Sequence, residues 1–212
     1  EVDEGQSAKI KKIIIIGNET YTDDELLDSF ELSEGSFFSF LSSNNQYSRE
    51  KLVGDIETLE SYYRDRGFLK FSIESSQISL SRDKKSIFIT FSVNEGEKYT
   101  IKDANVVGEI PFEEELYSDI ISSLEDQTYS QAQITGIEEF FVNVLGNRGY
   151  AFAEVTGNTE IIDDTNEVKL IFSIVPGNKT YTRKILFTGN NVTQDYVLRR
   201  EMRQFEGAWT SD

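Results

Sequence analysis

The sequence predicts an α+β fold made of tandem β-α-α-β-β units, each with a three-stranded mixed sheet covered on one face by two antiparallel helices. Three observations predict it. A helix, a glycine and a strand follow one another over residues 47–73, and the same stretch recurs from residue 129. Further predicted strands lie on either side of each stretch, and only a few residues link one copy to the next.

The recurring stretch begins with a helix whose two copies lie 82 residues apart. Ser48 is placed to cap the first helix, and Ser130 with Gln133 forms a capping box for the second. Gly67 and Gly149 end the helices where a left-handed residue is common, so both should have positive φ. A strand should follow without a loop. The apolar stripes are Leu52, Ile56, Leu59 and Tyr63 in one copy and Ile134, Ile137, Phe141 and Leu145 in the other.

The first copy has the order strand, helix, helix, strand, strand. Residues 8–16 are typical of a strand, and Gly17-Asn18 ends it as a turn. Thr22 and Glu25 form a capping box that starts the first helix. After the second helix and its strand, residues 81–85 turn the chain back. The last strand places Ile87, Ile89, Phe91 and Val93 on one face.

The second copy repeats this order, with a first strand at 101–107 that ends at Gly108 and a helix from about residue 112. Residues 163–166 are interpreted as a hairpin turn, because a calcium loop of the EF-hand type needs a different spacing and a glycine. A third copy starts at residue 179, with a strand at 181–187 and a helix at 193–205. It should be ordered by packing on the second copy or by adding its strand to another molecule.

Chain direction sets the topology of each sheet. The last two strands form an antiparallel hairpin, and the last strand runs parallel to the first, so the last strand is central. The expected domains are 1–5 as the tail of a preceding repeat, 6–96, 97–177, and 178–212 as a truncated copy with only a first strand and first helix. The abrupt beginning leads us to expect a piece of a longer protein.

Composition excludes several classes of function. The chain has 21 basic and 38 acidic residues, a net charge of −17, which argues against binding nucleic acid or anionic lipid. It has no histidine and no cysteine, which excludes zinc sites, disulfides, thiol nucleophiles and Ser-His-Asp triads, and no cofactor is expected. The acid pair Glu138-Glu139 is interpreted as solvated charge rather than an acid–base pair, so no enzyme is expected.

Three motifs resemble the POTRA domains of outer-membrane β-barrel assembly proteins from Gram-negative bacteria. They are the strand and Gly-Asn turn of residues 13–18 and 185–190, the Tyr-Tyr-x-x-Arg-Gly-Phe of 62–68, and the specific run at 198–209. The resemblance covers nearly the whole chain, whose copies look like the third, fourth and start of the fifth of five such domains.

The resemblance implies a periplasmic scaffold that receives unfolded outer-membrane proteins and docks accessory lipoproteins for their folding and insertion. It implies BamD as the lipoprotein at the truncated copy and BamB at the third-like domain. The residues implied for lipoprotein binding are Arg199, Arg203 and Glu206. Two alternatives stay open: the POTRA region of a related outer-membrane secretion or translocation transporter, and a rigid spacer that binds no client.

Two further stretches of the sequence are candidate surfaces. The free edge of the strand after Gly67 offers main-chain groups to an extended client, through Leu69, Lys70, Phe71, Ser72, Ile73, Glu74 and Ser75. Alternatively, Lys70 and Glu74 blunt this edge and it binds nothing. The phenylalanines Phe37, Phe38 and Phe40 form either a contact surface or a lid on the helices, and we expect at least one to be buried.

Overall fold

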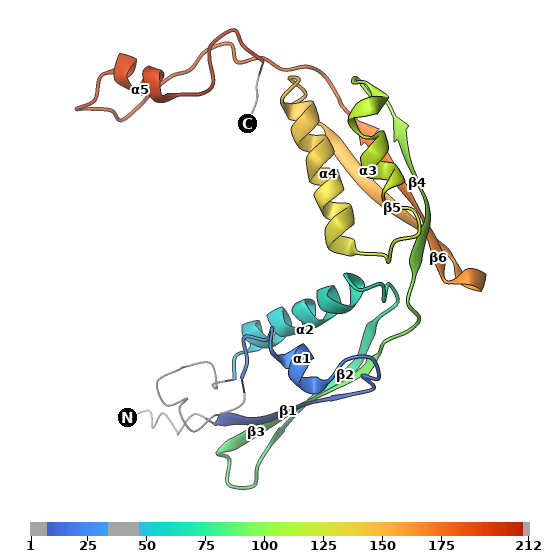
Figure 1. The fold of residues 1–212 in the computed structure, drawn as a ribbon. Helices are drawn as coiled ribbons and strands as arrows, with labels where there is room; N and C mark the ends of the chain where they lie inside the picture. Colours follow the sequence, from blue (N-terminus) through green and yellow to red (C-terminus); the bar gives the residue numbers. More distant parts are fainter. Residues whose placement is uncertain (1–7, 34–46, 210–212) are drawn as a thin grey trace. The chain divides into compact units, whose positions relative to one another are not determined.

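The computed structural model describes residues 8–33 and 47–209, and the chain divides into two compact units (Figure 1). One unit comprises Glu1–Thr100 with Thr128–Gln131, and the other comprises Ile101–Gln127 with Ala132–Asp212. Each contains a three-stranded sheet, with strand order β1-β3-β2 in the first and β4-β6-β5 in the second. The predicted topology, with the last strand of each copy in the centre, is confirmed.

Both copies have the predicted order of elements. The first contains β1 (Lys9–Ile16), α1 (Asp23–Leu27), α2 (Arg49–Arg64), β2 (Ser72–Leu80) and β3 (Ser86–Asn94). The second contains β4 (Thr100–Gly108), the 3-10 helix η3 (Glu114–Leu116), α3 (Ser118–Ser122), α4 (Gln131–Gly146), β5 (Glu154–Ile162), the 3-10 helix η4 (Asp163–Thr165) and β6 (Glu167–Val175). The third copy contains α5 (Asp195–Glu201).

β3 has two different neighbours. It runs parallel to β1, where Ile13 lies opposite Ile89, and antiparallel to β2, where Ile78 lies opposite the same residue. β5 and β6 are antiparallel without a break in register, and Gly157 lies opposite Phe172. The capping box of Thr22 and Glu25 starts α1, as predicted.

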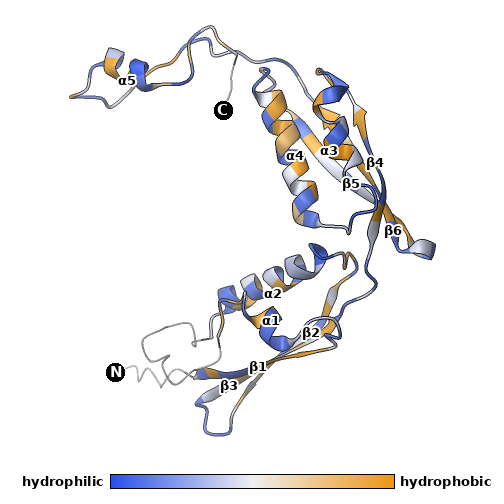
Figure 2. Cartoon of the chain, viewed as in Figure 1, coloured by the Kyte–Doolittle hydropathy of each residue, from blue (hydrophilic) through white to orange (hydrophobic). Residues whose placement is uncertain are grey.

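The apolar stripes of the long helices are buried, because each helix needs an apolar partner and the sheet supplies one. In α2, Leu52, Leu59 and Tyr63 are buried and Ile56 packs partly buried against the same core. In α4 all four stripe residues are buried, and Figure 2 shows hydrophobic and hydrophilic residues interspersed along this helix. The sheets contribute Ile87, Ile89, Phe91 and Val93 from β3 and Val168, Leu170, Phe172 and Ile174 from β6.

The two glycines that end the long helices have the predicted conformation. Gly67 has φ +101° and Gly149 has φ +92°. The carbonyl of each accepts an amide from the chain that follows, from Tyr99 at 2.9 Å and from Thr180 at 2.8 Å respectively. The recurring glycine therefore ends a helix and also supplies a hydrogen-bond acceptor to the start of the next copy.

Three predicted elements differ in the structure. The segment after Gly67 turns before β2 begins, so the expectation of a strand without a loop was wrong. The first helix of the second copy is divided between η3 and α3. Among the described residues of the third copy, residues 181–187 form no strand, only an isolated bridge between Tyr181 and Trp209. That segment bonds to its own copy instead, because Thr182 donates to the carbonyl of Ala208 at 2.9 Å.

We had expected residues 181–187 to add as a strand to another molecule, but these residues do not form the strand that this pairing needs. The expected burial of Phe37, Phe38 or Phe40 concerns residues that lie outside the described part of the chain. The turn at 163–166 contains η4 and the left-handed Asn166, with φ 52°, before β6 begins.

Candidate interaction surfaces

β2 lies at the edge of its sheet, beside β3. The orientation of the residues in β3 determines which main-chain groups of β2 face away from the sheet. An ideal Cβ on Gly17, just past β1, would lie 2.2 Å from the carbonyl oxygen of Val93, so this carbonyl points toward β1. Phe91 has the same orientation, because alternate residues of a strand point to the same side. Its partner Ser76 therefore directs its amide and carbonyl away from β3. The outward-facing positions beyond the bulge described below are Ser76, Ile78 and Leu80.

This edge is exposed and mostly polar. Every residue from Glu74 to Leu80 is exposed, including Ile78 at 46% and Leu80 at 53%. Within the described ranges 8–33 and 47–209, no side chain accepts a hydrogen bond from a main-chain amide of β2. An extended chain would find a row of unpaired donors and acceptors there, flanked by small serine side chains.

Only part of the predicted edge belongs to the strand. Ser72, Ile73, Glu74 and Ser75 lie in β2, whereas Leu69, Lys70 and Phe71 precede it. The prediction for these three residues was wrong because Phe71 is needed in the core. Its ring stacks on Tyr63 with centroids 4.1 Å apart, and only 3% of the residue is exposed. The main chain turns to place it there, with Phe71 donating to the carbonyl of Phe68 at 3.0 Å.

Between its first residue and Ser76, β2 contains one residue more than the matching part of β5, although both strands have nine residues. Ser72 opens β2 and Glu154 opens β5, an offset of 154 − 72 = 82. Ser76 lies opposite Phe91 and Gly157 opposite Phe172, an offset of 157 − 76 = 81. The register of β2 shifts between Ile73 and Ser75, so a bulge at Glu74 accounts for the extra residue.

In the second copy, a side chain reaches the edge strand. Glu138 on α4 accepts a hydrogen bond from the amide of Gly157 in β5. Gly157 permits this approach, because an ideal Cβ there would lie only 2.6 Å from Cγ2 of Ile134. The interpretation of Glu138 as solvated charge was therefore wrong, although Glu139 is exposed. The sequence signal is the glycine inside a strand, which often marks a close approach.

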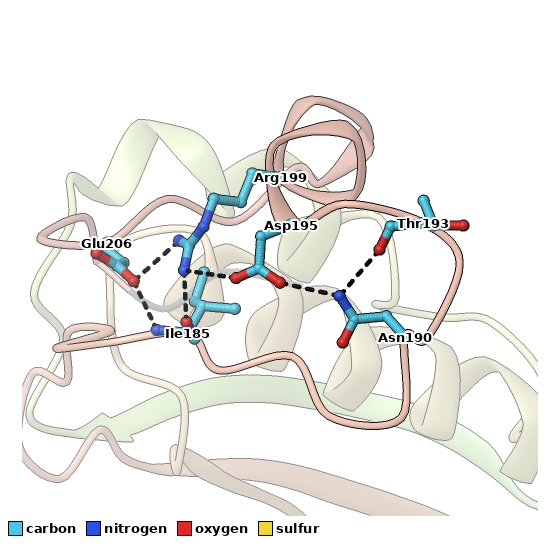
Figure 3. A network of polar contacts seen from close by, with 6 residues as sticks. All are labelled: Ile185, Asn190, Thr193, Asp195, Arg199 and Glu206. Carbon is cyan, nitrogen blue, oxygen red and sulfur yellow. Dashed lines mark hydrogen bonds and ion pairs between the residues drawn. The ribbon is translucent and has the colours of Figure 1, made fainter.

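The third copy contains a polar network that includes two of the residues implied for lipoprotein binding (Figure 3). Arg199 donates to Oε1 of Glu206 at 3.0 Å and to the carbonyl of Ile185 at 2.8 Å. The amide of Ile185 donates to the same Glu206 oxygen at 2.9 Å. The amide hydrogen bond from Ile185, together with Arg199, holds the pKa of Glu206 below its ordinary value. Arg199 and Glu206 thus hold the extended segment against α5, whereas Arg203 is exposed.

The Gly-Asn turn recurs with the same hydrogen bonds. Asn18 donates from Nδ2 to the carbonyl of Tyr21 at 3.0 Å and to Asp23 at 2.8 Å. Asn190 makes the equivalent bonds 172 residues later, to the carbonyl of Thr193 at 3.0 Å and to Asp195 at 2.9 Å (Figure 3). The motif therefore fixes the entry to the first helix of a copy, which explains its place in the sequence pattern.

A buried carboxylate links three parts of the first copy. Glu95, 9% exposed, accepts from the hydroxyl of Thr20 at 2.6 Å and from the phenol of Tyr63 at 2.7 Å. Burial by itself would raise the pKa of Glu95, but the hydrogen bonds from Thr20 and Tyr63 hold it below the ordinary value. Burial and the Glu95 carboxylate raise the pKa of Tyr63. No sequence pattern indicated this network, because Glu95 belongs to the short segment that was interpreted as a linker between the first and second copies.

A second buried carboxylate was also missed. Asp55, 1% exposed, accepts from the amide of Glu31 at 2.7 Å and from that of Leu32 at 3.0 Å. Burial raises the pKa of Asp55 in spite of these bonds. A signal was present, since Asp55 lies three residues after Leu52 and four before Leu59, on the apolar stripe of α2.

Metal binding and membrane crossing can be considered only for the part of the chain that the structure describes. Among residues 8–33 and 47–209, no group of three or more acidic, histidine or cysteine side chains is arranged to hold a metal ion. In the same ranges, no helix combines the length and apolar character needed to cross a membrane.

Comparison with known proteins places these observations in a family. The sequence model of POTRA, described as "Surface antigen variable number repeat", matches residues 8–96 and 99–177. The outer membrane protein assembly factor BamA of Neisseria meningitidis is 32% identical over 210 residues, which cover 98% of this chain and 26% of that protein. BamA of Buchnera aphidicola is 30% identical over 208 residues, which cover 98% of this chain and 34% of that protein.

A solved structure agrees in fold. The crystal structure of Haemophilus influenzae BamA POTRA3-5 aligns with a TM-score of 0.80 at 26% identity, over 96% of this chain and 80% of that one. The chain spans between about a quarter and a third of the length of the two curated relatives.

Proposed function

The chain belongs to the POTRA family, and on that premise we propose that it is part of the periplasmic scaffold of an outer-membrane β-barrel assembly factor. Its relatives at 30–32% identity are named as assembly factors of outer membrane proteins. In this proposal residues 6–96 and 97–177 act as the third-like and fourth-like domains. Residues 178–212 correspond to the start of a fifth-like domain, with α5 as its first helix.

The proposed activity is the binding of unfolded outer-membrane proteins as added β-strands along β2. The observation that supports it most directly is the exposed row of outward-facing main-chain groups at Ser76, Ile78 and Leu80. Pairing through the backbone does not depend on side-chain sequence, which suits a scaffold that handles many clients sharing only a strand-forming pattern. Client chains of this kind consist of strands that alternate apolar and polar residues.

A second proposed role is the docking of accessory lipoproteins, with BamD at the third copy and BamB at the third-like domain. Arg199, Arg203 and Glu206 are the proposed docking residues at the third copy. Because Arg199 and Glu206 bind Ile185, their proposed contribution is to shape the surface, and the exposed Arg203 is proposed to contact the partner. Exposed apolar side chains lie nearby, including Tyr196 at 68% and Phe205 at 66%.

The edge proposal is tested with Ile78→Pro, compared with Ile78→Ala. Proline removes the outward amide of residue 78, whereas alanine removes only the side chain, and neither change takes a donor from the β3 ladder. Binding of an unfolded outer-membrane protein, measured by fluorescence anisotropy, should weaken about tenfold for proline beyond the effect of alanine, as expected for one lost hydrogen bond and the added clash. Equal binding by both variants would favour a spacer that does not use this edge.

A further inference from the structure

In the second copy, a carboxylate of the long helix bonds to the free edge of the sheet. The amide of Gly157 donates to Glu138, and this amide faces the free side of β5. The pairing of β6 gives this orientation. The carbonyl of Ile174 in β6 accepts a hydrogen bond from the amide of Glu109, just past β4, at 3.3 Å. The main-chain groups of Phe172, two residues earlier, therefore also face β4. Gly157 lies opposite Phe172 and therefore points outward. Glu138 occupies an outward amide in the middle of the edge.

A carboxylate in this position opposes the addition of a strand. An incoming strand would place one of its carbonyl oxygens at the Gly157 amide, where the Glu138 oxygen already lies. It would have to displace a charge-assisted hydrogen bond, and its carbonyl would meet a negatively charged acceptor. Charged side chains placed at sheet edges prevent edge-to-edge pairing in other proteins by the same physics.

The position of the first copy that corresponds to Glu138 holds no carboxylate. The long helices align with an offset of 82, so the counterpart of Glu138 is Ile56, since 138 − 82 = 56. Ile56 is partly buried against the core and has no acceptor to offer. The counterpart of Gly157 is Ser76, at the centre of the β2 edge. From Ser76 and Gly157 onward, the two edges have matching outward-facing positions. They differ in whether a carboxylate of the long helix bonds to the edge.

We propose that Glu138 closes the β5 edge to extended chains and so directs strand addition to β2. The choice of β2 rests on the proposed function, but the closing of β5 by Glu138 is a property of the second copy alone. Glu138 would then determine which copy binds an extended segment, without contacting a segment that is bound at β2.

The test uses cross-linking at matched positions. The chain has no cysteine, so Gln77→Cys reports on β2 and Asn158→Cys reports on β5, two exposed counterparts with an offset of 158 − 77 = 81. The probe is a synthetic peptide of about eight alternating valines and threonines with one central cysteine, the length of an ordinary strand. Disulfide formation is measured by mass spectrometry in the Glu138→Ile variant, which carries the residue of the first copy.

The expected result is that the β5 reporter captures the peptide roughly tenfold more in Glu138→Ile than with Glu138 present, the factor for one charge-assisted hydrogen bond. Glu138→Gln keeps an acceptor and should give a smaller increase than Glu138→Ile. Glu139→Gln removes the same charge from the exposed neighbour and should leave capture at β5 unchanged. Equal capture at β5 by the chain that retains Glu138 and by the Glu138→Ile variant would overturn the proposal.

Amide hydrogen exchange provides an independent readout and a check of folding. The Gly157 amide should be protected when Glu138 is present and lose that protection in Glu138→Ile, while the amides that bond β5 to β6 keep theirs. An unprotected Gly157 amide in the unaltered chain would contradict the proposal. Absence of capture at β2 with capture at β5 in Glu138→Ile would refute the proposed function and leave the role of Glu138 standing. Absence of capture at both edges in every variant would refute both.

Discussion

The phenol of Tyr63 donates a 2.7 Å hydrogen bond to the carboxylate of Glu95, which lies 32 residues further along the chain. Tyr63 is fully buried near the end of α2, and Glu95 follows the last residue of β3. The bond therefore ties the end of the helix to the end of the central strand. The second copy has Leu145 and Pro176 at the counterpart positions, so this tie belongs to the first copy.

Tyr63→Phe should lower the free energy of unfolding by about 1–2 kcal/mol, because it leaves the buried Glu95 carboxylate without one of its donors. Urea denaturation followed by circular dichroism measures the change. Tyr62→Phe is the matched control, since it removes a hydroxyl from the adjacent, less buried tyrosine. Equal stability of Tyr63→Phe and the unaltered chain would show that this bond contributes nothing.

The hydrogen bonds to Glu95 should make stability depend on pH. Its pKa is held below the ordinary 4.5 in the folded chain, so its contribution is present above that value and is lost as the pH falls through the folded pKa. The difference in unfolding free energy between the unaltered chain and Glu95→Gln should therefore shrink as the pH falls from about 6 to about 3. Glu97→Gln, an exposed neighbour, is the control. A constant difference over this range would contradict the expectation.

Two glycines of the same region should respond in opposite ways to alanine. Gly67→Ala should destabilise by at least about 1 kcal/mol, because φ is +101° and the new Cβ would lie 2.8 Å from side-chain carbons of Lys98 and Thr128. Gly54→Ala in α2 should stabilise by about 0.5–1 kcal/mol, because its Cβ would meet nothing within 4 Å. Thermal unfolding of both variants checks the pair, and a shift of the melting temperature in the same direction would refute the argument.

Variants of Arg203 and Glu206 should have different effects, one on lipoprotein docking and the other on the local structure of the third copy. Glu206→Lys should accelerate exchange of the Ile185 amide, because it removes the acceptor at 2.9 Å and repels Arg199. Arg203→Glu should leave that amide unchanged and weaken retention of the lipoprotein in co-purification. Slow exchange at Ile185 in Glu206→Lys would show that the network does not hold the segment. Unchanged retention with Arg203→Glu would remove it from the docking surface.

The features that the sequence predicted well are those repeated or periodic in it. The stripes of α2 and α4, the alternation of β3 and the glycines at 67 and 149 follow from short-range geometry, and a second copy supported each interpretation. Chain direction was then sufficient to place the last strand of each copy in the centre of its sheet.

The errors concern residues whose position depends on distant partners. The strand was predicted to include Leu69, Lys70 and Phe71, but the stacking of Phe71 on Tyr63 requires a turn. Glu138 read as solvated, because its partner Gly157 lies 19 residues away and belongs to a different element. Residues 181–187 were expected to form a strand, yet Arg199 and Glu206 bind the main-chain groups of Ile185. Periodicity gives no information about such contacts.

If β2 binds clients as proposed, the bulge at Glu74 limits the length of client strand that can pair with it. Outward-facing positions are three residues apart across the bulge, from Ile73 to Ser76, and two residues apart after it. An added strand can therefore keep a continuous hydrogen-bond register only from Ser75 to Leu80. Six residues span about 20 Å at ~3.3 Å each. A membrane-spanning β-strand has about 9–11 residues. The β2 edge would therefore pair with little more than half of such a strand. The rest of the client strand would stay available to pair with the next strand of the nascent barrel.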